Sequence, residues 1–232
     1  GHHEHVRTAG VHSKFGIPLF ELKEVQALLA RHQVNVVGLH AHTGSGILQS
    51  DNWRNIAETL IEAAQTFPGV KVLDLGGGLG VPEKTGQHSL NLPALDDSLA
   101  ALKEQYDQYE FWLEPGRYIV AEAGVLLATV TQTKGKGKIR YVGISTGMNS
   151  LIRPALYGAF HEIVNLSRLS ESAGHVVNIV GPICESGDRL GNDRWLPACE
   201  EGDVILVANA GAYGHVMGSN YNLRSPAVEV AI

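Results

Sequence analysis

The sequence predicts an α/β fold with an added β domain: the second half of a (β/α)8 barrel of the TIM type, followed by a mostly antiparallel β domain. Two observations carry this prediction. Up to about residue 124, short Val-rich runs alternate with stretches of helical periodicity. Beyond residue 125, helical stretches become rare and short β-branched runs follow one another. We therefore predict two domains, residues 1–124 and 125–232.

In the first domain the apolar spacing predicts three helix–strand repeats. Leu95, Leu99, Leu102 and Tyr106, for example, recur at steps of four, three and four residues. Helices are expected at 19–32, from Ser50 or Asp51 to Pro68, and at 93–109. Strands are expected at 34–40, 70–75 and 109–113. Three repeats are too few to close a barrel, so we expect only part of one.

The second domain is expected to begin with a hairpin. Strands at 125–133 and 139–145 flank the solvated loop Lys134-Gly135-Lys136-Gly137-Lys138. Further strands are expected at 176–183, 204–208 and 228–232, and one helix at 154–168.

Composition excludes several classes of protein. The net charge of −6 argues against a nucleic-acid partner. No apolar run reaches the roughly 20 residues of a membrane helix, so no membrane partner is expected. Two cysteines form no disulfide framework, which favours the reducing cytoplasm. The opening Gly-His-His-Glu-His is a tag remnant, a metal cluster or a natural loop; no cysteine or distant carboxylate completes a metal site, and we predict none.

Polar, glycine-rich runs follow apolar stretches at four places. These runs are His40–Gly46, Leu73–Gly80, Glu114–Arg117 and Gly181–Asp188. Active sites of parallel α/β barrels lie beyond the carboxyl ends of the strands, so the first three runs are expected to meet there. The fourth contains the thiol of Cys184 and the carboxylates of Glu185 and Asp188, and it is expected to deliver an acid/base pair to one place; the alternative is a buried cysteine beside a polar turn.

Residue chemistry suggests what these runs could bind. Glycine turns after strands can offer backbone N–H groups to a single phosphate, although they also serve tight turns. Glu114 could pair with a protonated ring nitrogen and His42 could lie flat on a cofactor; the alternatives are a Glu114–Arg117 ion pair and a core histidine. Arg153 suits a carboxylate, and Tyr213 offers a hydroxyl at a strand end, unless both are ordinary surface or core residues.

Taken together and in order, the motifs resemble those of the pyridoxal-phosphate-dependent decarboxylases with the alanine-racemase-like barrel fold. The resemblance runs from about Val6 to the C-terminus. It rests on His-Ser-Lys-Phe-Gly, His-Thr-Gly-Ser-Gly, Gly-Gly-Gly-Leu-Gly, Glu-Pro-Gly-Arg, Arg-Pro-Ala-Leu-Tyr-Gly, Cys-Glu-Ser-Gly-Asp, and Gly-Ala-Tyr-Gly with Ser-Asn-Tyr-Asn. Arg-Pro-Ala-Leu-Tyr and Cys-Glu-Ser-Gly-Asp are similar to those of members that convert meso-2,6-diaminopimelate to L-lysine.

The resemblance implies a role for each matching residue. It assigns pyridoxal 5'-phosphate contacts to His42, Ser45, Gly76, Gly77, Gly78, Glu114, Gly116, Arg117 and Tyr213. It assigns substrate contacts to Arg117, Arg153, Tyr157, Glu185 and Tyr213. The implied catalytic residues are His42 on the pyridine ring, Glu114 at the ring nitrogen, and Cys184 as the acid that protonates the substrate carbon. A homodimer with shared active sites is implied, since Cys184 and Glu185 reach the partner's site in the family.

One departure from the family is serious. Its cofactor-bearing lysine lies in an Ala-x-Lys-Ala-Asn run, and none of the eight lysines here stands in such a run. We expect the chain to be a fragment that lacks this lysine, the first barrel strands and the end of the β domain. We also expect it to turn over no substrate alone.

Three other functions remain open. A related decarboxylase could act on ornithine, lysine or carboxynorspermidine, but those substrates do not need both Arg153 and Glu185. A non-catalytic regulatory homologue would bind a partner, and it would be expected to lose cofactor residues that are present here. A metal hydrolase built on the N-terminal histidines would leave the other motifs unexplained.

Overall fold

A computed structural model describes residues 13–232, which divide into two compact units. The first unit contains residues 13–81 together with His88–Tyr118. The second contains Ile119–Ile232 and also the loop Pro82–Gln87, whose contacts lie within that unit.

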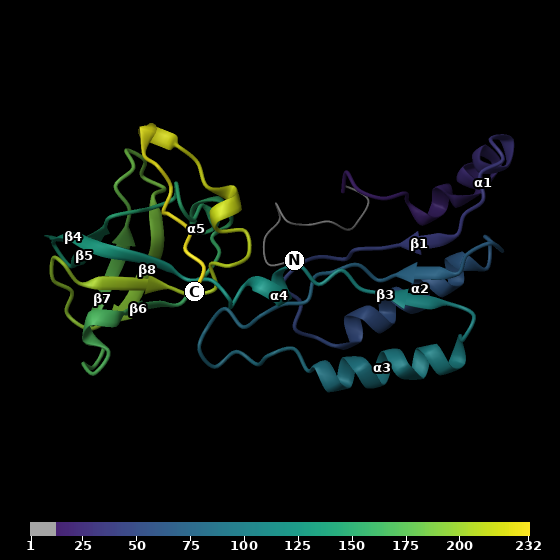
Figure 1. The fold of residues 1–232 in the computed structure, drawn as a ribbon, viewed down its shortest axis with the longest axis horizontal. Helices are drawn as coiled ribbons and strands as arrows, with labels where there is room; N and C mark the ends of the chain where they lie inside the picture. The colour runs from purple at the N-terminus through teal and green to yellow at the C-terminus, as the bar shows by residue number, and fades with distance from the viewer. Residues whose placement is uncertain (1–12) are drawn as a thin grey trace. The chain divides into compact units, whose positions relative to one another are not determined.

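The first unit is built on a parallel sheet of three strands (Figure 1). β1 (Gly38–His40), β2 (Val72–Asp74) and β3 (Glu110–Trp112) lie in that order, with β2 in the centre. His40 is level with Asp74, and Asp74 with Trp112, so the three carboxyl ends stop at one edge of the sheet. The predicted strand–helix series is confirmed, with each strand shorter than its apolar run.

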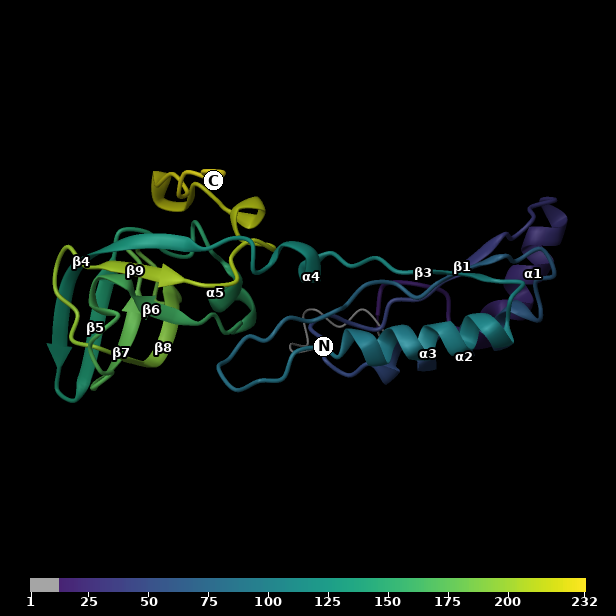
Figure 2. The same cartoon turned by 60° about the horizontal axis from the view of Figure 1, so that its bottom comes forward.

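Helices α1 (Leu22–Arg31), α2 (Asp51–Ala64) and α3 (Leu92–Gln105) complete the first unit. α2 and α3 run side by side and pack on the strands (Figures 1 and 2). α2 buries Trp53, Ile56 and Leu60 against a core that includes the fully buried Leu73. α3 starts where Asn91 Oδ1 accepts a hydrogen bond from the Ala94 N–H, with Pro93 in the first turn.

The second unit is a six-stranded, mostly antiparallel sheet, as predicted (Figure 2). Its strands are β4 (Leu126–Lys136), β5 (Ile139–Ile144), β6 (Ile163–Asn165), β7 (His175–Val180), β8 (Arg189–Leu196) and β9 (Val204–Val207). They lie in the order β6-β9-β4-β5-β7-β8, and the β5–β7 pair is parallel. The edge strands β6 and β8 contact each other, so the sheet is nearly closed.

Two predicted elements are wrong, and β4 extends into the loop predicted at 134–138. The helix expected at 154–168 is only α5 (Arg153–Tyr157), because Gly158 takes a left-handed φ of 61° and ends it. Residues 163–165 then pair with β9 as β6. Residues 228–232 form no strand, and Val228 and Val230 are exposed. The sequence analysis also missed the polar strand β8, which depends on pairing with β7.

A buried carboxylate ties the loops of the second unit together. Asp203 Oδ2 accepts hydrogen bonds from Arg168 Nε at 2.8 Å, Asn165 Nδ2 at 2.9 Å and the Glu200 N–H at 2.9 Å. Burial by itself raises the pKa of Asp203, but these hydrogen bonds outweigh it and leave the pKa below its ordinary value. The hydrogen bond to Asp203 and the negative charges of Asp203, Glu200 and Glu171 raise the pKa of Arg168.

We predict that Asp203→Asn destabilises the full-length protein that contains this chain. Loss of the Asp203 charge should lower the free energy of unfolding by about 2 kcal/mol at pH 7, because the partly exposed Arg168 loses a hydrogen-bonded carboxylate. A carboxyl group with a lowered pKa stabilises the fold above its unfolded pKa of about 4, and this contribution is lost as pH falls through the folded pKa. The difference from wild type, measured by urea unfolding, should therefore shrink in acid.

Asp193→Asn is the matched control, since Asp193 is exposed and its φ of 50° is tolerated by asparagine. An Asp203→Asn protein as stable as this control at pH 7 would contradict the prediction.

Candidate active site

The carboxyl ends of the parallel strands bring three titratable side chains together. His40 and Asp74 are the last residues of β1 and β2, and Glu114 lies two residues beyond β3. One ligand atom from each lies within 4.8 Å of the others. His40 Nε2 is 3.0 Å from Glu114 Oε2, and Asp74 Oδ1 accepts the Gly76 N–H at 2.9 Å. The sequence analysis missed His40, although its place at a strand end was the available signal.

His42 lies beside this group with its ring held in one orientation. The Gly77 N–H donates to His42 Nδ1 at 3.2 Å, which leaves Nε2 to carry the proton of the neutral ring. Burial lowers the pKa of His42, the Glu114 carboxylate opposes this shift, and His40 adds to it. The ring is therefore neutral at pH 7, which suits a flat apolar contact.

The two glycine-rich runs lie directly against each other. The Ile47 N–H donates to Gly78 O, and the Gly80 N–H donates to Ile47 O, each at 2.9 Å. A side chain at Gly77 would collide with the carbonyl oxygen of Glu114. These glycines therefore serve close backbone approach, and the N–H groups of Gly76 and Gly77 are already donated to Asp74 and His42. Trp53, from α2, supports the turn by donating Nε1–H to Gly77 O at 3.1 Å.

Arg117 and Ser45 form the next part of the site. Arg117 is the first residue of α4 (Arg117–Val120) and is buried. Its Nε and Nη2 groups donate to Ser45 Oγ at 3.3 and 3.1 Å. Gly116 lies between Glu114 and Arg117 in sequence. The two charged residues of this short turn have different partners, because Glu114 bonds to His40 and Arg117 bonds to Ser45.

The donor chemistry of the first unit fits pyridoxal phosphate. The Glu114 side chain is 55% exposed and can meet a protonated ring nitrogen. His42 offers a neutral ring, and the Ser45 hydroxyl with the Arg117 guanidinium offers donors suited to a phosphate. Gly78 and Gly116 belong to the same loops. The residues thus supply an acceptor, a flat surface and anion donors from adjacent strand ends.

The second unit carries four of the five residues predicted to bind substrate, all except Arg117. Arg153 and Tyr157 are the first and last residues of α5, one helical turn apart. Arg153 is buried, with Nη1 at 3.0 Å from His161 Nε2 and Nη2 at 3.8 Å from Glu83 Oε1. Tyr213 is 45% exposed and has a φ of 57°, which is uncommon for a non-glycine residue.

Cys184 and Glu185 lie in an exposed turn of the second unit. The Cys184 N–H donates to Asn222 Oδ1 at 2.8 Å. Asp188, from the same run, is buried. Its carboxylate accepts the N–H groups of Met148 at 2.6 Å and Ile183 at 2.7 Å. Asp188 therefore shapes the turn that presents Cys184.

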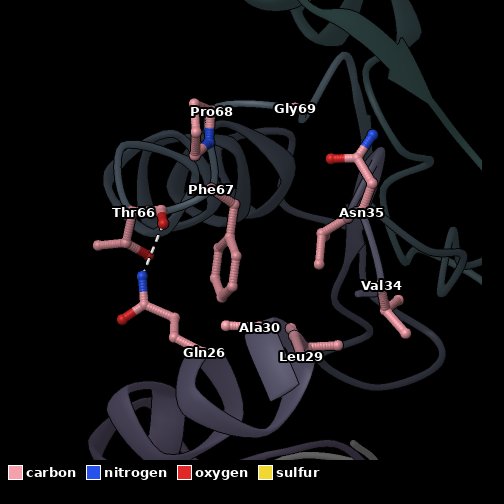
Figure 3. Close-up of a pocket in the computed structure, with 10 residues that line it drawn as sticks. Gln26, Leu29, Ala30, Val34, Asn35, Thr66, Phe67, Pro68 and Gly69 are labelled. Atoms are coloured by element: carbon pink, nitrogen blue, oxygen red, sulfur yellow. Dashed lines mark hydrogen bonds between the residues drawn. The ribbon is translucent and has the colours of Figure 1, made fainter. Parts of the chain in front are cut away.

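A cavity of about 220 Å³ lies at the other end of the strands (Figure 3). Its lining residues include Val34–Val36, just before β1, and Phe67–Gly69, just before β2. Gln26 Nε2 donates across it to Thr66 O at 2.6 Å and links α1 to the end of α2. The amino ends of barrel strands serve stability in this architecture, and no predicted site residue lines this cavity.

Two other sequence expectations concern metals and membranes. The N-terminal histidines considered as metal ligands lie outside the described residues. Within residues 13–232, His40, Asp74 and Glu114 are spaced as a metal site requires; His40 Nε2 is hydrogen-bonded to Glu114 Oε2, and Asp74 Oδ1 accepts the Gly76 N–H. Across the same residues, no helix has both the length and the apolar character needed to cross a bilayer.

Comparison with known proteins links both units to one group of enzymes. Residues 1–121 match the family model of the pyridoxal binding domain of pyridoxal-dependent decarboxylases. Residues 72–211 match the model of the C-terminal sheet domain of the same enzymes. The diaminopimelate decarboxylase of Methanothermobacter thermautotrophicus is 37% identical over 243 residues, covering 100% of this chain and 56% of the relative. The chain thus spans little more than half of that relative's length.

Solved structures give the same result. A crystal structure of diaminopimelate decarboxylase superposes with a TM-score of 0.85 at 32% identity, covering 97% of this chain and 57% of that chain. Diaminopimelate decarboxylase from M. jannaschii, in complex with L-lysine, superposes with a TM-score of 0.79 at 35% identity, covering 93% and 52%.

We predict that His42 makes the stability of the cofactor-free full-length protein depend on pH. Because its folded pKa is lowered, the unfolded chain takes up a proton first as pH falls below about 6.5, and stability falls with it. The slope from one such group is at most ~1.4 kcal/mol per pH unit. Urea unfolding between pH 5 and 8 should show this slope reduced in His42→Asn, which keeps an acceptor for the Gly77 N–H.

His88→Asn, at an exposed histidine of the same unit, is the control and should keep the wild-type slope. An unchanged slope in His42→Asn would show that the ring is not held neutral by burial.

Proposed function

This chain belongs to the pyridoxal-dependent decarboxylase family, and from that premise we propose that its full-length protein decarboxylates meso-2,6-diaminopimelate to L-lysine. The observation that carries the proposal is that similarity to diaminopimelate decarboxylases extends over the whole chain. The site residues support it because they supply separate receptors for a cofactor, a carboxylate and an ammonium group.

In this proposal the first unit holds pyridoxal phosphate. Bound there, the cofactor supplies an electron sink for the charge left when carbon dioxide departs. Glu114 keeps the ring nitrogen protonated, and its hydrogen bond from His40 fixes the carboxylate. His42 lies against the ring face. Ser45, the glycine loops with Gly116, and Arg117 surround the phosphate.

The second unit supplies the substrate contacts. Arg153 and Tyr157, on one face of α5, receive the distal carboxylate of the substrate, and Glu185 receives the distal ammonium group. Arg117 and Tyr213 contact both cofactor and substrate. A substrate with an amino-acid group at each end uses all of these receptors. A substrate whose far end is a simple amine offers no carboxylate to the Arg153 guanidinium.

Cys184 is the proposed acid. As the bond to the departing carboxyl group breaks, carbon dioxide leaves and its electron pair stays with the substrate carbon. The Cys184 thiol then transfers its proton to that carbon, and solvent restores the thiol. The exposed turn of Cys184 and Glu185 suits delivery into the active site of a second copy, so we propose a homodimer with shared sites.

We further propose that the protein works in the cytoplasm, in lysine biosynthesis. Both cysteines of the chain are free thiols, as expected in a reducing compartment. A lysine-complexed structure is among the similar proteins, consistent with an amino-acid product of that kind.

Substrate choice by the full-length protein tests the proposal directly. We expect carbon dioxide release with pyridoxal phosphate from meso-diaminopimelate, at a kcat/KM at least about a hundredfold above that for L-ornithine or L-lysine, because only diaminopimelate offers the distal carboxylate. Preference for ornithine or lysine would overturn the assignment of Arg153 and Glu185. Release from none of the three would favour the regulatory homologue.

Substitution of the proposed acid gives a second test. Cys184→Ala should lower kcat by about 10²–10³ with little change in KM, because proton delivery is lost while binding remains. Cys199→Ala is the control: burial raises the pKa of that thiol, which has no proposed role. Equal kcat values for the Cys184→Ala protein and wild type, in a steady-state assay, would exclude the thiol as the acid.

A further inference from the structure

Arg153 is held by a histidine whose protonation the geometry defines. His161 is fully buried, with Nδ1 at 2.8 Å from Ala208 O and Nε2 at 3.0 Å from Arg153 Nη1. A carbonyl oxygen only accepts hydrogen bonds, and a guanidinium only donates them. The proton of the ring therefore lies on Nδ1, and the Nε2 lone pair faces Arg153. His161 is a neutral acceptor that links a strand-end carbonyl to the guanidinium.

The second neighbour of Arg153 is a carboxylate at longer range. Glu83 Oε1 is 3.8 Å from Arg153 Nη2, too far for a hydrogen bond but close enough to balance a buried charge. The Glu83 side chain is 23% exposed and that of Arg153 is 3% exposed. Glu83 can therefore move toward solvent, whereas Arg153 cannot.

The loop that carries Glu83 is fastened on both sides of that residue. Asn209 Nδ2 donates to Pro82 O at 3.0 Å, and Thr85 Oγ1 donates to Glu162 Oε2 at 3.2 Å. The backbone of the loop is thus anchored to the second unit, and its carboxylate can rotate without loss of the anchors.

We propose that His161 is a positioning residue that fixes Arg153 as a carboxylate receptor, and that Glu83 is the resident carboxylate which the substrate's distal carboxylate displaces. This inference deepens the proposed function and rests on it. A ligand carboxylate that forms direct, charge-assisted hydrogen bonds competes well against one held only by charge at 3.8 Å. Glu83 then keeps the buried guanidinium compensated between turnovers.

The tests use two inhibitors of the full-length enzyme that differ by one carboxylate, L-lysine and 1,5-diaminopentane. The ratio of their inhibition constants isolates the contribution of the carboxylate receptor. A merely structural defect would weaken both inhibitors together, so the ratio separates positioning from stability.

Two substitutions of similar size test His161. His161→Gln places an amide oxygen near the former Nε2 and can still accept from Arg153, whereas His161→Asn keeps a donor for Ala208 O and cannot reach Arg153. We expect His161→Asn to lose about ten- to a hundredfold of the preference for L-lysine over 1,5-diaminopentane, and to change the KM for diaminopimelate more than kcat. His161→Gln should recover most of that preference.

Glu83→Gln should act in the opposite direction. Loss of the resident carboxylate should tighten L-lysine several-fold, lower the KM for diaminopimelate, and leave 1,5-diaminopentane unchanged. Glu171→Gln, which removes one charge from an exposed residue of the same unit, is the control and should change neither inhibitor. If both His161 variants fail to fold, Glu83→Gln decides the proposal alone.

The outcomes distinguish failure of the proposed decarboxylase function from failure of the roles given to His161 and Glu83. A wild-type enzyme that releases no carbon dioxide from diaminopimelate overturns the proposed function. An active enzyme whose inhibitor ratio is unchanged in His161→Asn, or whose L-lysine binding is weakened or unaltered by Glu83→Gln, overturns only the roles given to those residues.

Discussion

The in-register parallel pairing of β1, β2 and β3 is the constraint on which the candidate active site depends. Because His40 lies level with Asp74, and Asp74 with Trp112, the residues that follow each strand begin at the same edge of the sheet. A shift of one strand would separate His40 from Glu114 and move the glycine-rich turns apart. The hydrophobic contacts of α2 and α3 with these strands hold the register.

Backbone contact between the turns adds a second level of order. Gly77 lies against the Glu114 carbonyl. Its N–H donates a hydrogen bond to His42, and its carbonyl oxygen accepts one from the indole of Trp53. One turn thus positions His42 and Glu114 together. A similar arrangement occurs in the second unit, where hydrogen bonds to the buried Asp188 hold the turn that contains Cys184. Buried polar groups hold exposed reactive groups in place, because a buried carboxylate must be satisfied by the loops around it.

Much of the fold could be predicted from the sequence. Helical periodicity and Val-rich runs indicated the strand–helix series, since both reflect which faces must be buried. The length of the helix after Arg153 could not be predicted, because Gly158 ends it and β9 recruits the residues beyond. β8 was missed for a related reason. Its polar residues are extended because they pair with β7, and the local sequence contains no pattern that indicates this pairing.

By itself the sequence determined the reactive groups, the glycines that allow close approach, and the class of cofactor those residues suit. Only the tertiary structure decided how each polar group is used. It made Asp188 a buried support for a turn, paired His40 with Glu114, and placed His161 between Ala208 and Arg153. The reason is physical: residue type fixes what a side chain can donate or accept, but burial and the partners that long-range packing brings within about 3 Å determine which of those bonds it makes.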